Sequence, residues 1–160
     1  AEQRDEGVPL ADSVMSRFSG VKLIDSSDLP SGVRVAPGAF GKKDTSLQLF
    51  DREAPRPTFP NNWHREPGKA KGDFVMTITC KRLLIVHKKS PAGNSFGMAD
   101  VLVDGEVVTT LDGEPRNGWN NPWTTVIVDD DTARLHVVTV KMAEGYEAGA
   151  FTILAFGYTD

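Results

Sequence analysis

From Val21 onward, short apolar runs alternate with polar residues and are separated by turns rich in Gly, Pro, Asn and Asp. The clearest run is FVMTITC, in which Phe74, Met76 and Ile78 fall on one face and Thr77 and Thr79 on the other. A period of two is typical of a strand with one buried face. The pattern therefore predicts an antiparallel β meander over residues 73–160.

The alternating segments follow one another closely along the chain, and the dipeptide Asp104-Gly105 between two of them is the strongest short hairpin signal in the sequence. Turn signals recur every ~8–12 residues, which favours an all-β sandwich or jelly roll with little helix, with a closed barrel as the alternative. We expect about nine or ten strands, chiefly from the segments 21–25, 46–50, 74–80, 82–88, 98–103, 106–111, 123–128, 133–142 and 150–158. By alternation, the expected core is Phe74, Met76, Ile78, Leu84, Val86, Val101, Val103, Ile127, Val138, Val140, Phe151 and Ile153.

The chain of 160 residues is long enough for one domain with its own core. Residues 1–20 are polar and acidic and are expected to be a linker or N-terminal extension, followed by a single domain over 21–160. Residues 51–72 carry four prolines and are expected to be a long irregular loop, a kind of segment that is often functional.

The formal charge of −4 argues against a nucleic-acid partner, because a phosphate-binding surface usually has a basic excess. No apolar run approaches the ~18 residues that span a bilayer, so no membrane partner is expected. Cys80 is the single cysteine, which excludes an internal disulfide. Lys81, Arg82, Lys88 and Lys89 bracket one segment and are expected to be charges at a strand edge.

The sequence lacks the motifs of a catalytic site. There is no Gly-x-Ser-x-Gly, and Ala11-Asp12-Ser13 lacks the glycine and the preceding apolar strand of a nucleophile turn. The histidines do not have the spacing of a zinc site. A pair of carboxylates from distant strands stays compatible with the spacing, but the chain is short for a deep cleft. We expect no enzyme activity.

The acidic run 129–131 is expected to be a solvated turn, with no metal and no cofactor. Its alternative role is a calcium site, for which Asp129 and Asp131 are weak candidates, because clustered carboxylates suit this hard cation.

Each of the three tryptophans lies beside an Asn-Asn pair in a polar loop, in PNNWH and in GWNNPW. The negative face of an indole ring stacks on the C–H face of a pyranose, and planar amides serve the hydroxyl groups. The pattern predicts an exposed carbohydrate-binding platform. Its residues are Trp63, Trp119, Trp123, Asn62, Asn120 and Asn121.

Residues ~45–160 resemble the non-catalytic β-sandwich module attached to SGNH/GDSL-type carbohydrate esterases and plant-cell-wall hydrolases. The resemblance rests on FPNNWHR (59–65), TCKRLLIVHK (79–88), FGMADVLVDGEVVTTLDG (96–113), GWNNP (118–122) and HVVTVKMAEG with FTILAFGY (136–158). It implies a jelly-roll sandwich that acts on or near glycans and supplies no catalytic serine.

The sequence thus predicts a carbohydrate-binding module that anchors a linked glycoside hydrolase or esterase on polysaccharide of the β-glucan, xyloglucan or xylan class. The alternative is a structural accessory domain that packs against an esterase and binds no sugar itself. In either case we expect a monomer in a longer bacterial chain, located outside the cell.

Overall fold

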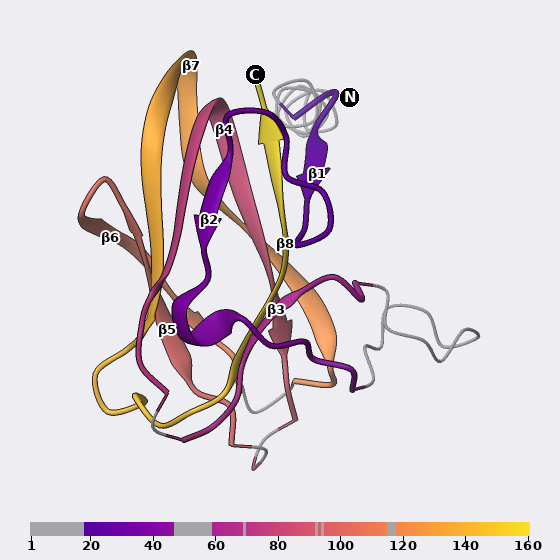
Figure 1. The fold of residues 1–160 in the computed structure, drawn as a ribbon, viewed down its shortest axis with the longest axis vertical. Helices are drawn as coiled ribbons and strands as arrows, with labels where there is room; N and C mark the ends of the chain where they lie inside the picture. The colour runs from indigo at the N-terminus through magenta and orange to yellow at the C-terminus, as the bar shows by residue number, and fades with distance from the viewer. Residues whose placement is uncertain (1–17, 47–58, 69, 92, 94, 115–117) are drawn as a thin grey trace, which may run out of the picture.

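The computed structural model describes residues 18–46, 59–68, 70–91, 93, 95–114 and 118–160. The expected strand at 46–50 and the Ala11-Asp12-Ser13 motif lie wholly or mostly outside these residues. The described chain is built from strands, with one 3-10 turn, η1 (Gly38–Phe40) (Figure 1). The strands are β1 (Lys22–Ile24), β2 (Arg34–Ala36), β3 (Trp63–Arg65), β4 (Phe74–Lys89), β5 (Met98–Val103), β6 (Glu106–Asp112), β7 (Asn121–Met142) and β8 (Phe151–Thr159).

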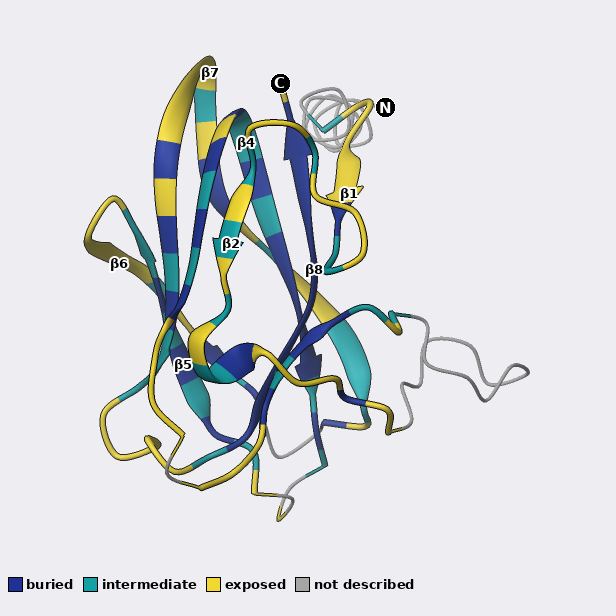
Figure 2. Cartoon of the chain, in the orientation of Figure 1, coloured by how far each residue is buried: buried dark blue, intermediate teal, exposed yellow. Residues whose placement is uncertain are grey.

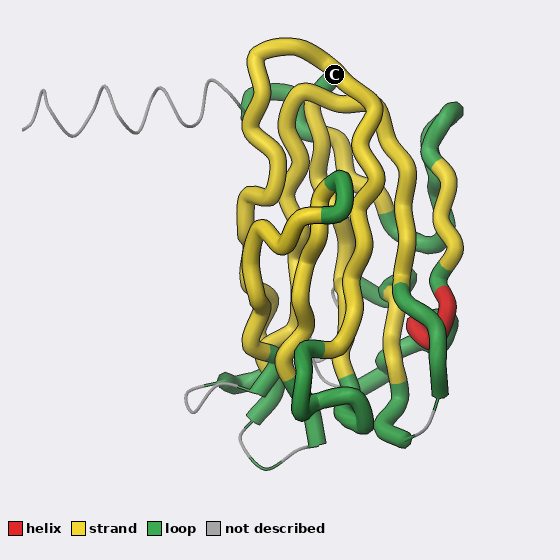
Figure 3. The backbone as a smooth tube through the Cα atoms, turned by 90° about the vertical axis from the view of Figure 1, so that its left-hand side faces the viewer, coloured by secondary structure: helices red, strands yellow, loops and turns green. Residues whose placement is uncertain are grey.

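Strands β4 and β7 each join two segments that the sequence predicts as separate strands. They pair antiparallel over their whole length, from Phe74 opposite Val140 to Lys89 opposite Asn121. The register shifts next to Arg82, where both strands turn over at one end of the molecule (Figures 1 and 3). Each strand therefore contributes one half to each of two layers.

The first layer contains β2, the N-terminal half of β4, the C-terminal half of β7, then β5 and β6. The second layer contains β1 and β3, both paired with β8, then the C-terminal half of β4 and the N-terminal half of β7. Every ladder between these strands is antiparallel. The fold is the expected antiparallel β-sandwich.

The core lies between the layers, and β8 is buried along its whole length (Figure 2). The predicted core is correct except for Val103, which is only partly buried and packs against the core, and except on the second half of β4. There the shift in register exchanges the two faces, so that Leu83 and Ile85 enter the core in place of Leu84 and Val86. Val86 is buried outside the core cluster, and Leu84 is half-buried.

The predicted hairpin is confirmed. Asp104 and Gly105 connect β5 to β6 with φ angles of 53° and 87°, which is the pattern of a type I′ turn. The described residues contain no helix long and apolar enough to cross a membrane.

Candidate functional site

The loops before β4, between β4 and β5, between β6 and β7 and between β7 and β8 gather at one end of the sandwich, which we call the loop end (Figures 1 and 3). It lies opposite the bends of β4 and β7. Two of the three predicted tryptophans, Trp119 and Trp123, lie at this end.

A tight turn presents Trp119 to solvent, with 68% of its surface exposed. Gly118 packs so closely on the Ser90 carbonyl oxygen that a Cβ would overlap it. Asn120 adopts a left-handed conformation with φ 62°, and the Trp119 backbone N–H donates to Asn121 Oδ1 at 3.1 Å. The Gly-Trp-Asn-Asn sequence therefore fixes the backbone of the turn. Both asparagines are half-buried, and part of the Asn121 amide is used inside the turn.

Trp123 follows on β7, with its Cα opposite that of His87, and is 51% exposed. The Nζ atom of Lys89 lies 3.4 Å from the centroid of the Trp123 ring, a close cation–π contact. The loop end thus carries two exposed indoles, as expected. Contact of either ring with a sugar stays a prediction.

The third tryptophan does not belong to this surface, and the prediction that Trp63 is part of an exposed platform is wrong. Trp63 lies on β3, is 4% exposed, and packs edge-on against Phe74 and Phe156 in the core. The alternation of β3 points its neighbour His64 to the other face. The proline-rich sequence around β3 predicts a loop, but the structure has a three-residue strand there.

Asn62 is also misassigned as a sugar contact, because it is fully buried. Its Oδ1 accepts a hydrogen bond from the Asp44 backbone N–H at 2.8 Å, and its Nδ2 donates to the carbonyl oxygens of Asp44 and Phe59. Asn62 therefore fastens two segments of the chain together.

A buried ion pair that sequence reasoning missed stands beside Asn62. Lys88 Nζ lies 3.1 Å from Asp44 Oδ2, and both side chains are at most 5% exposed. Thr152 Oγ1 donates to the same carboxylate oxygen at 2.7 Å, and Lys88 Nζ also donates to Ser46 Oγ. Lys88 is therefore not an edge charge. It lies on the half of β4 that runs between β7 and β8.

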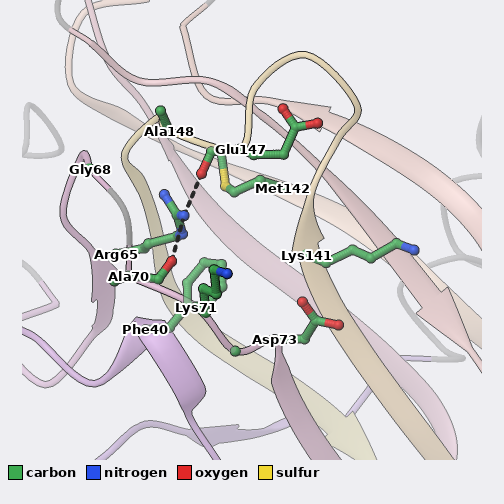
Figure 4. A pocket seen from close by; sticks show the side chains of 11 residues that line it. Phe40, Arg65, Gly68, Ala70, Lys71, Asp73, Lys141, Met142, Glu147 and Ala148 are labelled. Carbon is green, nitrogen blue, oxygen red and sulfur yellow. Dashed lines mark hydrogen bonds between the residues drawn. The ribbon is translucent and has the colours of Figure 1, made fainter.

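Arg65 is a second buried cation that the sequence did not reveal. Its guanidinium donates to the carbonyl oxygens of Ala70, Glu147 and Gly149, and so it ties the loop before β4 to the loop before β8. Between these loops lies an open cavity of about 530 Å³ (Figure 4). Phe40 of η1 and Met142 at the end of β7 are among its lining residues.

The acidic run 129–131 lies at the bend of β7, opposite the loop end. Asp129 and Asp131 both face Arg82, at 3.0 and 3.5 Å, which offsets the charge that a calcium ion would require. Among the described residues, no group of three or more His, Cys, Asp or Glu side chains is arranged to hold a metal ion.

No family model and no curated protein matches the chain. Among solved structures, a two-domain esterase active on acetylated mannans and co-crystallised with mannopentaose aligns with a TM-score of 0.58 at 16% identity. The match covers 89% of this chain and 38% of the esterase. A family 35 carbohydrate-binding module from an environmental isolate aligns with a TM-score of 0.51 at 15% identity, over 87% of this chain and 93% of that module.

These likenesses confirm the fold that the sequence resemblance implies. The chain is a β-sandwich of the kind that forms a whole carbohydrate-binding module and little more than a third of a two-domain carbohydrate esterase.

Proposed function

We propose that the chain is a non-catalytic carbohydrate-binding module that anchors a linked catalytic domain on plant cell-wall polysaccharide of the β-glucan, xyloglucan or xylan class, outside the cell. The observation that carries this proposal is the exposure of Trp119 and Trp123 at one end of the sandwich. The shared fold with a family 35 module supports it.

The exposure of the two indole rings is not explained by a contribution to folding stability. Burying a large apolar side chain contributes about 1.5–3 kcal/mol to folding, and a ring left mostly in water forgoes most of that. The turn that holds Trp119 depends on a glycine in a crowded position and an asparagine with positive φ, so the chain positions this ring in a defined place. Such a ring offers a flat apolar face to the C–H groups of a pyranose.

The proposal is tested by affinity electrophoresis of the full chain against xylan, β-glucan, xyloglucan and mannan. We expect retention by at least one polysaccharide, and about a tenfold loss of affinity for Trp119→Ala and for Trp123→Ala, on the order of one stacking contact each. The matched control is Leu135→Ala, which removes a side chain that is 65% exposed near the opposite end. Wild-type retention by both tryptophan variants, or no retention of the wild type, would refute the proposal.

A second function is favoured by the outer face of the first layer. By register, Leu102, Val107, Leu135 and Val137 share this face, and the last three are 39–65% exposed. Contiguous exposed apolar surface is typical of interaction sites, so this face suits an accessory domain that packs on a catalytic domain. An unretained wild-type chain whose binding of a hydrophobic dye falls in Leu135→Glu would favour this second function.

A further inference from the structure

The walls of the cavity at the loop end are held in place by hydrogen bonds within the chain. The Arg65 guanidinium donates to the carbonyl oxygens of Ala70 from one wall and of Glu147 from the other (Figure 4). It also donates to the Gly149 carbonyl oxygen. The floor is equally fixed, because the Ala39 backbone N–H donates to the Gly72 carbonyl oxygen at 3.0 Å. A site whose walls are bound to each other needs little ordering when it binds a ligand.

The charge of Arg65 lacks a counterion in this arrangement. The side chain is 5% exposed, its guanidinium donates hydrogen bonds to carbonyl oxygens, and no carboxylate of the described residues forms an ion pair with it. Burial lowers the pKa of the guanidinium from its ordinary value, and no acidic group opposes that effect. An anion placed in the cavity would relieve this cost.

The remaining charges around the cavity do not cancel this preference. The Glu147 carboxylate accepts a hydrogen bond from the Gly145 backbone N–H at 3.0 Å and is turned away from Arg65 (Figure 4). Asp73 and Lys141 also line the cavity, and no ion pair joins them, but their opposite charges add no net charge to the lining. Among the described lining residues, Lys71 is therefore a second positive charge beside Arg65.

The rest of the lining is apolar. Phe40 forms part of the floor, and Met142 and Ala148 stand on the opposite side (Figure 4). A flexible thioether in a largely apolar lining favours a flat, polarizable ligand over a fully hydroxylated one.

We propose that this cavity binds an aryl carboxylate, such as a hydroxycinnamate anion, with its ring against Met142 and Ala148 and its carboxylate toward Lys71 and Arg65. This site is separate from the exposed tryptophans, and its ligand is recognised by one negative charge and one planar apolar body.

Titration calorimetry of the full chain at pH 7 tests both features with three probes. We expect ferulate to bind with one-to-one stoichiometry. Methyl ferulate lacks the charge and glucuronate lacks the aromatic ring, so each should bind about tenfold more weakly or worse, on the scale of one charge-assisted hydrogen bond or one buried ring. Equal binding of methyl ferulate would overturn the anionic site, and equal binding of glucuronate would overturn the aryl site.

Two variants locate the ligand. Ala148→Trp fills the cavity and should abolish ferulate binding, whereas Ala133→Trp at the opposite end should leave it unchanged. Lys71→Gln should weaken ferulate binding about twofold to fivefold, as expected for an exposed charge, against no effect of Lys81→Gln. Polysaccharide retention should be unchanged in all four variants. Wild-type ferulate binding by Ala148→Trp, or none by the wild type, would refute the proposal.

Discussion

The ammonium group of Lys89 covers one face of the Trp123 indole, with Nζ 3.4 Å from the ring centroid. A cation at this position is held by ~0.5–1 kcal/mol at an exposed site. A sugar that stacks on the same face must displace the lysine first. Lys89 therefore competes with the ligand that we propose for Trp123.

Lys89→Ala should consequently strengthen polysaccharide binding about twofold to fivefold, the factor that corresponds to the lost cation–π contact. Affinity electrophoresis measures the change, with Lys81→Ala at the bend of β4 as a control of equal charge. Weaker binding by Lys89→Ala would show instead that the lysine itself contacts the ligand.

Trp63 and Trp119 should behave oppositely when truncated. Trp63→Ala leaves a cavity between Phe74 and Phe156 and should lower the free energy of unfolding by ~3–5 kcal/mol. Trp119→Ala removes a ring that is 68% exposed and should change it by under ~0.5 kcal/mol. Urea unfolding followed by circular dichroism measures both values. Similar losses in the two variants would place Trp119 in the fold rather than in a binding surface.

The sequence predicts those elements whose pattern is local. The turn at Asp104-Gly105 is specified by two residues that tolerate positive φ, and the alternation from Phe74 to Ile78 is unbroken. After Cys80 the side chains of β4 that face the core change from even-numbered to odd-numbered positions. The sequence does not predict this change, because an extra residue at a bend cannot be recognised from the hydrophobic pattern. The apolar segment around Leu83 and Ile85 has no polar face by which to choose its register.

The candidate site likewise contains residues that the sequence predicts and residues that it does not. Trp119 is recognisable as exposed because Gly and Asn surround it, but the same polar neighbours mislead at Trp63, where a loop closes directly into a strand. Arg65, Lys88 and Asp44 find their partners up to 108 residues away in sequence. No spacing rule predicts contacts that only the packing of the two layers creates.

The ion pair between Lys88 and Asp44 should contribute strongly to stability only as a pair. Lys88→Met leaves a carboxylate buried without its cation and should cost ~3–5 kcal/mol in the free energy of unfolding. Adding Asp44→Leu to Lys88→Met should restore part of that loss, because the uncompensated charge is removed. A double-mutant cycle by urea unfolding measures this coupling, and strictly additive losses would contradict it.

The Asp44 carboxylate should make the free energy of unfolding depend on pH in the acidic range. Burial alone would raise the pKa of Asp44, but hydrogen bonds from Ser46 and Thr152 and the charge of Lys88 outweigh burial and lower it below 3.8. Asp44 therefore stabilises the fold above its unfolded pKa, and this stabilisation is lost as pH falls through the lower, folded pKa. In Asp44→Asn this loss below pH ~4 should be smaller, as read from unfolding midpoints.

His87 should produce a separate loss of stability at mildly acidic pH. Its side chain is 1% exposed and stacks on Phe151, its Nε2–H donates to the Asp112 carbonyl oxygen at 3.1 Å, and its Nδ1 has no hydrogen-bond partner among the described residues. Burial, the largest cause, lowers its pKa from 6.5 to about 4.

Between pH 4 and pH 6.5 the unfolded chain binds a proton at His87 that the folded chain does not, so the free energy of unfolding rises with pH across this window. A full shift of this size corresponds to about 3 kcal/mol lost between pH 7 and pH 4. Urea unfolding at half-unit steps of pH should show this slope in the wild type and a clearly smaller one in His87→Gln, while Asp44→Asn keeps it. The remaining slope would come from His64, because burial also lowers the pKa of that imidazole from its ordinary value. An unchanged slope in His87→Gln would assign the acid sensitivity to another group.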